Sequence, residues 1–288
     1  MTIDRRIESI HAAFRTVEGD GIDVLRAVPG QGYESVGPFI FLDHFGPIAW
    51  QDGEAKGASS HPHAGIETMT LLLEGRMRHK DSLGNESTMA PGDVQWMRAG
   101  RGIVHDEQPD VSAMSPGERT HGIQVWLNLP SGGKHVAPQY RHVTRPEIPL
   151  IASTHDANRI RLVAGDILDA RGPVETGGRP LVVHASLAMA EAMSIPVRPE
   201  AELAVYVMLG AARVGVRRDR VAAGQLARLA PGEQLLLANE PDTELLVFGG
   251  DPLDARIVRY GPFVMNTLDE LRRAVADFQA GRMGHIAA

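Results

Sequence analysis

The fold of this chain is decided by two segments of similar build, HPHAGIETMTLLLEG (61–75) and APGDVQWMRAGRGIVHDE (90–107). The first carries His61 and His63, and the second carries His105 and Glu107, so each holds two ligand-type side chains two residues apart. Side chains with that spacing on a β-strand point to the same face. Each segment can therefore aim two ligands at one point inside a barrel.

The sequence around these segments is typical of an all-β protein. Apolar runs of strand length recur at 68–73, 122–128, 203–209 and 244–248. The chain contains 31 Gly and 19 Pro, which suits many short strands joined by tight turns. Asp81-Ser-Leu-Gly-Asn85 reads as a hairpin loop between two strands. The pattern predicts a sandwich or barrel and not alternating β and α units.

One helix is predicted, close to the C-terminus. Thr267-Leu-Asp-Glu270 matches a capping box, in which the Thr and Glu side chains bond early amide groups. Apolar residues then recur at helical spacing up to Phe278, and Gly281 stands where a helix would stop. We expect this helix to pack over the barrel surface.

A weak internal repeat indicates two copies of one barrel. The segment 71–75 is followed by Ala-Pro-Gly at 90–92, and the segment 207–210 is followed by Ala-Pro-Gly at 230–232. The residues 131–138, rich in Gly and ending in Pro, resemble a linker. We therefore predict a metal-binding barrel over 1–137 and a second barrel over 138–288, which ends in the helix.

The second barrel is predicted to lack metal ligands. Setting Gly75 against Gly210 places Pro196 and Arg198 opposite the two His of the first segment. Setting the two Pro-Gly turns against each other places Leu245 and Val247 opposite the His and Glu of the second segment. One metal per chain is the expectation.

Composition excludes several classes of function. The chain has 29 Lys and Arg against 36 Asp and Glu, a formal charge of −7, and no basic run, so direct nucleic-acid binding is not expected. It has no apolar span of membrane length and no signal-peptide start, so neither membrane insertion nor export is expected, and the cytoplasm is the predicted location. With no Cys, disulfides and thiolate chemistry are excluded.

The four ligand-type residues suit a divalent first-row metal, because three imidazoles and a carboxylate leave one or two positions for water, oxygen or substrate. A lone His-x-His is a weak signal, but the second pair strengthens it. Gln124 and Trp126 alternate with apolar neighbours and could face either the metal cavity or the core. Asp43 and His44 are predicted to belong to a turn, and His79 to the surface.

The sequence resembles the pirin family, two-barrel members of the cupin superfamily. The stretches that carry the resemblance are GPFIFLDHFGP (37–47), HPHAGIET (61–68), LEGRMRHKDSLGN (73–85), APGDVQWMRAGRGIVHDE (90–107), HGIQVWLNLP (121–130) and GPFVMNTLDELRRAVADFQAGRMG (261–284). The resemblance implies that His61, His63, His105 and Glu107 are the metal ligands. Ala64 and Ile66 depart from the family, since many members have Arg and Phe there.

The resemblance also implies a function. Iron is the usual metal of the family, with Mn, Co, Ni or Zn as alternatives, and some members cleave quercetin with dioxygen. We therefore expect an Fe(II)-dependent dioxygenase that acts on a flavonol or a related enol-bearing aromatic, with Glu107 also serving as a base. A non-catalytic protein, whose metal state controls its binding to a transcription factor or metabolic enzyme, is the second hypothesis. A metal-dependent isomerase or hydrolase is the third.

Overall fold

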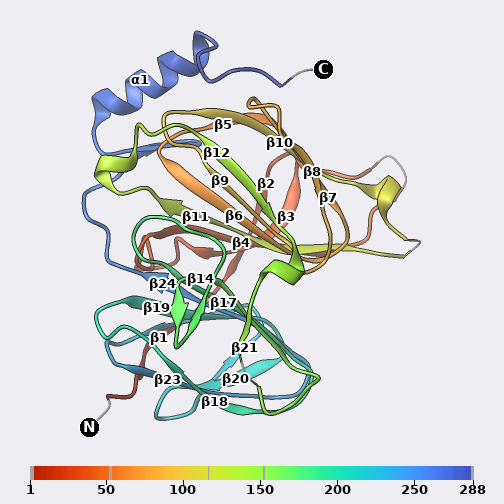
Figure 1. Ribbon diagram of the computed structural model, residues 1–288, viewed down its shortest axis with the longest axis vertical. Coiled ribbons are helices and arrows are strands. Elements are labelled where there is room, and N and C mark those ends of the chain that lie inside the picture. Colours follow the sequence, from red (N-terminus) through yellow and green to blue (C-terminus); the bar gives the residue numbers. More distant parts are fainter. Residues whose placement is uncertain (1–2, 52–53, 116, 152, 287–288) are drawn as a thin grey trace. The chain divides into compact units, whose positions relative to one another are not determined.

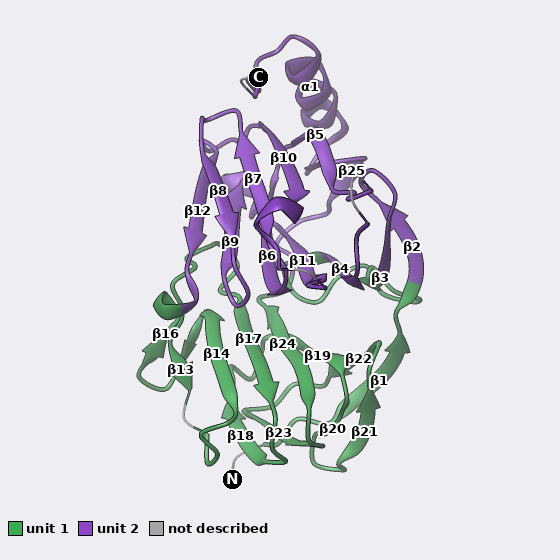
Figure 2. Ribbon diagram, turned by 90° about the vertical axis from the view of Figure 1, so that its right-hand side faces the viewer, with its two compact units in different colours: residues 1–14, 26–40, 146–252 green, residues 15–25, 41–145, 253–288 purple. Residues whose placement is uncertain are grey.

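The computed structural model describes residues 3–51, 54–115, 117–151 and 153–286. It divides into two compact units, coloured separately in Figure 2. Unit 1 comprises residues 1–14, 26–40 and 146–252, and unit 2 comprises residues 15–25, 41–145 and 253–288. These units differ from the consecutive halves 1–137 and 138–288, because each draws on three separate stretches of chain. The C-terminal segment with its helix belongs to unit 2 and not to the second barrel.

Unit 2 is built on two antiparallel sheets (Figure 1). The larger sheet has the order β12 (Gln139–Val143), β9 (Val94–Arg98), β6 (Ile66–Glu74), β11 (Thr120–Asn128), β4 (Phe39–Ile48), β3 (Ile22–Val28) and β2 (Phe14–Glu18). The smaller has the order β5 (Ala58–His63), β10 (Ile103–Pro109), β7 (Met77–Asp81) and β8 (Glu86–Met89). Strands β7 and β8 pair as the predicted hairpin around 81–85.

Unit 2 also holds the short strands β25 (Val258–Tyr260) and β26 (Phe263–Met265), two 3-10 turns (Val111–Ala113 and Ser131–Gly133), and helix α1 (Leu268–Gln279). The predicted capping box is confirmed, since Thr267 Oγ1 accepts a hydrogen bond from the Glu270 amide and the Glu270 carboxylate accepts one from the Thr267 amide. Leu271 and Ala274 pack on Phe263, so the helix covers part of the unit that carries the site.

Unit 1 repeats the two-sheet plan. One sheet has the order β1 (Ile7–Ala12), β22 (Gln225–Leu229), β19 (Glu202–Leu209), β24 (Thr243–Gly250), β17 (Leu181–Leu187), β14 (Arg159–Ala164) and β13 (Leu150–Ile151). The other has the order β18 (Ala192–Pro196), β23 (Gln234–Asn239), β20 (Ala211–Val214) and β21 (Asp219–Ala222). A hairpin of β15 (Asp166–Ile167) and β16 (Ala170–Arg171), and a 3-10 turn at Arg145–Glu147, complete the described elements. The predicted all-β class with two cupin-like barrels is confirmed.

The strand pairings correct the alignment of the two barrels. Strand β10 lies between β5 and β7 in unit 2, and β23 lies between β18 and β20 in unit 1, so these two strands correspond. Leu245 and Val247 lie instead on β24, the counterpart of β11. The sequence alignment was wrong by one strand because Gly92 precedes β9 whereas Gly232 precedes β23.

The strands of unit 1 that correspond to β5 and β10 nonetheless carry aliphatic side chains where unit 2 carries its predicted ligands. Leu235 and Leu237 on β23 and Ile195 on β18 are buried in its aliphatic core. Each such side chain contributes about 1.5–3 kcal/mol by leaving water. Among the described residues, groups of three or more potential metal ligands occur in unit 2 alone. These groups place the candidate functional site in unit 2.

No helix among the described residues combines the length and apolar character needed to cross a membrane.

Candidate metal centre

Three of the four predicted ligands meet on neighbouring strands of unit 2. Strands β5 and β10 are antiparallel, with His105 opposite His61 and Ile103 opposite His63. The three imidazoles therefore share one face. Their ring centroids are 4.3 Å (61 to 105), 4.9 Å (61 to 63) and 5.0 Å (63 to 105) apart. One ring nitrogen from each lies within 4.8 Å of the others, so the three could bind a single ion.

Backbone carbonyls fix the orientation of two of these rings. His61 Nδ1 lies 2.8 Å from the Ser59 oxygen, and His63 Nδ1 lies 3.3 Å from the Pro262 oxygen. A carbonyl oxygen only accepts, so each Nδ1 carries the proton and each Nε2 presents a lone pair. The two Nε2 atoms face each other at 3.1 Å. A cation between these lone pairs removes their repulsion, and metal-binding His residues commonly use the other ring N–H in this way.

His105 gives the strongest indication of a missing ligand. Its side chain is 1% exposed, and neither ring nitrogen has a hydrogen-bond partner among the described residues. An unpaired buried polar group costs about 1–3 kcal/mol. Burial, together with His61 and the neighbouring imidazoles, holds the pKa of His105 well below its usual range. Burial and then His61 lower the pKa of His63 to about 3, although the Pro262 carbonyl opposes this. Both rings are thus neutral at pH 7, the form that binds metals.

The fourth predicted ligand, Glu107, is buried but does not belong to the potential ligand group formed by His61, His63 and His105. Gln95 Nε2 donates to its Oε1, and Gln124 Nε2 donates to its Oε2 at 2.8 Å. Glu107 forms a second potential ligand group with His79 and His105, whereas the group of His61, His63 and His105 does not include it. Each carboxylate oxygen retains another lone pair, so the two amide bonds are compatible with a metal ligand.

Aromatic side chains form one wall of the site. Trp126 stacks on Phe41 with ring centroids 4.4 Å apart and meets the edge of His63 at 4.8 Å. His61, Gln124 and Trp126 are half-buried, so the site opens on their side. The other three predicted ligands, His63, His105 and Glu107, are buried. Gln124 and Trp126 therefore face the site and not only the core.

His79 was wrongly predicted to be a surface residue. It is 0% exposed, stacks on Tyr140 with centroids 4.0 Å apart, and its Nε2 lies 3.1 Å from Asp81 Oδ2. Its ring centroid is 5.5 Å from that of His105. The sequence held a signal, because His79-x-Asp81 has the same two-residue spacing as the other pairs and places both side chains on one face.

The predicted turn at Asp43 and His44 is also wrong. Both residues are buried in β4, and His44 Nε2 lies 2.7 Å from His121 Nε2. Burial and His121 lower the pKa of His44 to about 4, so this ring is neutral and the two imidazoles share a hydrogen bond. The pair is structural and joins β4 to β11.

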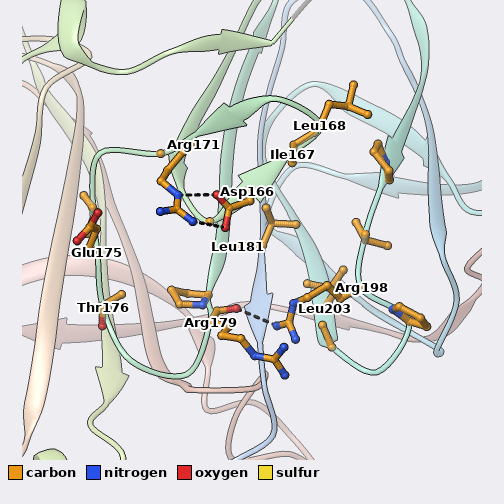
Figure 3. A pocket seen from close by; sticks show the side chains of 18 residues that line it. Asp166, Ile167, Leu168, Arg171, Glu175, Thr176, Arg179, Leu181, Arg198 and Leu203 are labelled. Atoms are coloured by element: carbon orange, nitrogen blue, oxygen red, sulfur yellow. Dashed lines mark hydrogen bonds and ion pairs between the residues drawn. The ribbon is translucent and has the colours of Figure 1, made fainter.

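A cavity of about 630 Å³ opens in unit 1 (Figure 3). It lies beside Pro196 at the end of β18, the strand that corresponds to the ligand-bearing β5. Its three arginines are already ion-paired, Arg171 with Asp166, and Arg179 and Arg198 with Asp251. The arginine side chains of this cavity are thus paired with carboxylates, while the groups of potential metal ligands among the described residues lie in unit 2.

Comparison with known proteins also finds two domains in this chain. The family model "Pirin" matches residues 21–127, and the model "Pirin C-terminal cupin domain" matches residues 182–284. The chain belongs to the pirin family. Pirin of Mus musculus is 33% identical over 272 residues, which cover 93% of this chain and 90% of that protein.

Other members of the pirin family carry enzyme names. A Pseudomonas aeruginosa protein named "Putative quercetin 2,3-dioxygenase PA3240" is 35% identical, covering 98% of this chain and 99% of its own. The crystal structure of quercetin 2,3-dioxygenase from Acinetobacter baumannii has a TM-score of 0.90 at 33% identity, covering 98% of this chain and 99% of that one. A bacterial pirin from Escherichia coli, solved in complex with nickel(II), shares the fold with a TM-score of 0.65 at 21% identity, covering 85% of this chain and 99% of that one.

A buried glutamate near the site predicts a pH effect on stability. Glu67 is 1% exposed and accepts a hydrogen bond from Arg98 Nε at 2.8 Å. Burial raises its pKa from 4.5 to about 7, although Arg98 opposes the shift. Between pH 4.5 and 7, Glu67 is therefore protonated in the folded protein but ionised in the unfolded chain. The free energy of unfolding consequently falls as the pH rises through that window.

Replacing Glu67 by Gln is expected to raise the free energy of unfolding at pH 8 by about 1–3 kcal/mol, and to change it little at pH 5. Urea unfolding of the metal-free protein at both pH values measures this. Glu86→Gln, at an exposed glutamate, serves as the control. Equal effects of Glu67→Gln at pH 5 and pH 8 would contradict the prediction.

Proposed function

We propose that this protein is a metal-dependent dioxygenase of the pirin type, which opens a flavonol such as quercetin, or a related enol-bearing aromatic, with O2. The observation that carries the proposal is the cluster of the His61, His63 and His105 imidazoles, in which both nitrogens of His105 are buried without a partner among the described residues. The likeness to the Acinetobacter baumannii quercetin 2,3-dioxygenase supports the substrate class.

His61, His63, His105 and Glu107 would hold one divalent ion per chain, with Fe(II) proposed. The donor set also suits Mn, Co, Ni and Zn, and affinity alone does not select iron. When bound, such an ion supplies a Lewis acid for a substrate hydroxyl and the redox chemistry with O2. The remaining steps belong to side chains of this chain.

The side chains around the ion would bind and orient the substrate. The half-buried face of Trp126, backed by Phe41, suits stacking against a flat aromatic ring. Glu107 would accept the proton of the substrate hydroxyl, and Gln95 and Gln124 hold its carboxylate in place for this. The burial of His63, His105 and Glu107 would limit the access of bulk water to that side of the site.

Oxygen consumption tests the proposal. Protein loaded with Fe(II) under anaerobic conditions is mixed with a 3-hydroxyflavone panel, and with the matching flavones that lack the hydroxyl. We expect one O2 per flavonol and none with the flavones. His61→Ala and Glu107→Ala should lose at least about 100-fold in rate, while His155→Ala, at an exposed histidine, should retain it.

Two results would count against the dioxygenase. Stoichiometric metal binding without O2 uptake would leave a metal-binding protein whose role is to engage another protein. Turnover of the flavonol without O2 would instead indicate a metal-dependent isomerase or hydrolase.

A further inference from the structure

The three clustered imidazoles differ in how their second nitrogen is held. His61 and His63 each donate Nδ1–H to a backbone carbonyl. His105 has no carbonyl or side-chain partner for either nitrogen among the described residues, although it is 1% exposed. A metal accounts for one nitrogen of His105. The other still requires a hydrogen-bond acceptor, because a buried N–H without one is costly.

The neighbouring ring of His79 offers such an acceptor. Asp81 accepts hydrogen bonds from the amides of Leu83 and Asn85 and from Asn85 Nδ2, so its carboxylate is the ionised, accepting form. His79 Nε2, 3.1 Å from Asp81 Oδ2, must therefore carry the proton. In the neutral form of this ring the lone pair lies on Nδ1, which is buried and has no partner among the described residues.

The distance between the two rings fits a direct bond. The hydrogen-bonded pair of His44 and His121 has an N···N distance of 2.7 Å and ring centroids 5.0 Å apart. The centroids of His79 and His105 are 5.5 Å apart, and a nitrogen of each belongs to the same potential ligand group. The two rings thus lie at nearly the separation of a directly bonded imidazole pair, with one nitrogen of each within 4.8 Å of the other.

We propose that Asp81 and His79 form a relay to His105, in which Asp81 accepts from His79 Nε2–H and His79 Nδ1 accepts from a ring N–H of His105. The inference rests on the proposed metal site. His79 is a positioning residue: it fixes the ring of His105 so that the other nitrogen faces the metal. A carboxylate-backed partner also makes His105 a more basic ligand than a carbonyl-backed one. The stack on Tyr140 holds His79 in plane for this role.

Nitrogen NMR of the full-length protein tests the relay directly. With 15N-labelled histidine and Zn(II) as a diamagnetic probe, we expect a scalar coupling between one His79 and one His105 nitrogen, transmitted across the N–H···N bond. Zn(II) should also shift nitrogen signals of His61, His63 and His105. Those shifts without the coupling would overturn the relay and leave the metal site standing. If Zn(II) shifts none of them, the metal site fails and the relay with it.

Variants provide a second readout. His79→Phe keeps a flat ring against Tyr140 but removes the acceptor, and should weaken Zn(II) binding by about 10- to 100-fold. His79→Asn, which restores an acceptor oxygen near the Nδ1 position, should recover part of the loss. His142→Phe is the control, because His142 pairs with Asp93 at 3.0 Å and lies outside both potential ligand groups. Unchanged Zn(II) affinity in folded His79→Phe would overturn the proposal. If His79→Phe does not fold, the wild-type coupling decides.

Discussion

Replacing His105 by Ala is expected to abolish stoichiometric metal binding, with an affinity loss of at least about 100-fold. His105 belongs to both potential ligand groups of unit 2, and its two unpaired nitrogens are the least satisfied polar atoms of the site. Without it, His61 and His63 retain two nitrogens on one strand and no ligand from β10 except Glu107. Calorimetric titration of metal-free protein with Co(II) measures the loss.

In the metal-free protein, His105→Ala should lower the free energy of unfolding by less than an ordinary large-to-small substitution of a buried residue does. Removing the ring also removes the desolvation cost of the nitrogen that faces the metal position, which has no partner in the metal-free protein, and this offsets part of the cost of the cavity created. His142→Ala provides a control outside the site. Tight 1:1 binding of Co(II) by His105→Ala would show that the ion is held elsewhere, and the proposed ligand set would have to be abandoned.

Lys134→Met is expected to lower the free energy of unfolding by about 3–5 kcal/mol. The Lys134 side chain is fully buried, and Nζ donates to the Gly65 oxygen at 2.7 Å, to Asn128 Oδ1 at 2.5 Å and to the Val264 oxygen at 2.9 Å. Methionine fills much of the same volume but leaves these three acceptors without that donor. Burial lowers the pKa of Lys134 to about 8, although Asp254 and Glu270 oppose the shift.

Urea unfolding of the metal-free protein at pH 7 measures the effect, with Lys80→Met as the control because Lys80 is about one-third exposed and pairs with Glu86. We expect the variant to unfold in a single transition, because Lys134 links the turn after β5, at Gly65, to strand β26, which precedes α1. A change below about 1 kcal/mol would mean that water replaces the ammonium group, and that Lys134 is not a structural link.

Local patterns predicted much of this molecule. The two-residue spacing of His61 and His63 placed both on one face of β5, and the capping box at Thr267 fixed the start of α1. Both signals are contained within a few residues, so they can be read without knowing the tertiary fold. The sequence also predicted that the two segments aim their ligands at one point, and the pairing of β5 with β10 brings His61 opposite His105.

Features that depend on distant partners could not be read in the same way. A lysine or arginine ordinarily indicates exposed surface, yet Lys134 is buried by carbonyls from residues 65 and 264, and Arg5 is buried by five carbonyls from the segment 198–232. His79 was missed because its neighbour His105 lies on a strand that pairs with β7 from 26 positions away. The alignment of Leu245 and Val247 with His105 and Glu107 was wrong because the Ala-Pro-Gly motif precedes β9 in one unit and β23 in the other, and these strands do not correspond.

Unit 2 is assembled from chain segments that are synthesised at different times, because it includes residues 41–145 and residues 253–288. A nascent chain that has emerged as far as residue 145 already carries His61, His63, His105 and Glu107, but it lacks residues 253–288. Those last residues supply the Pro262 oxygen that orients His63 and the Val264 oxygen that accepts from Lys134. We therefore expect the geometry described here, and metal binding that depends on it, to form only after synthesis has passed residue 264.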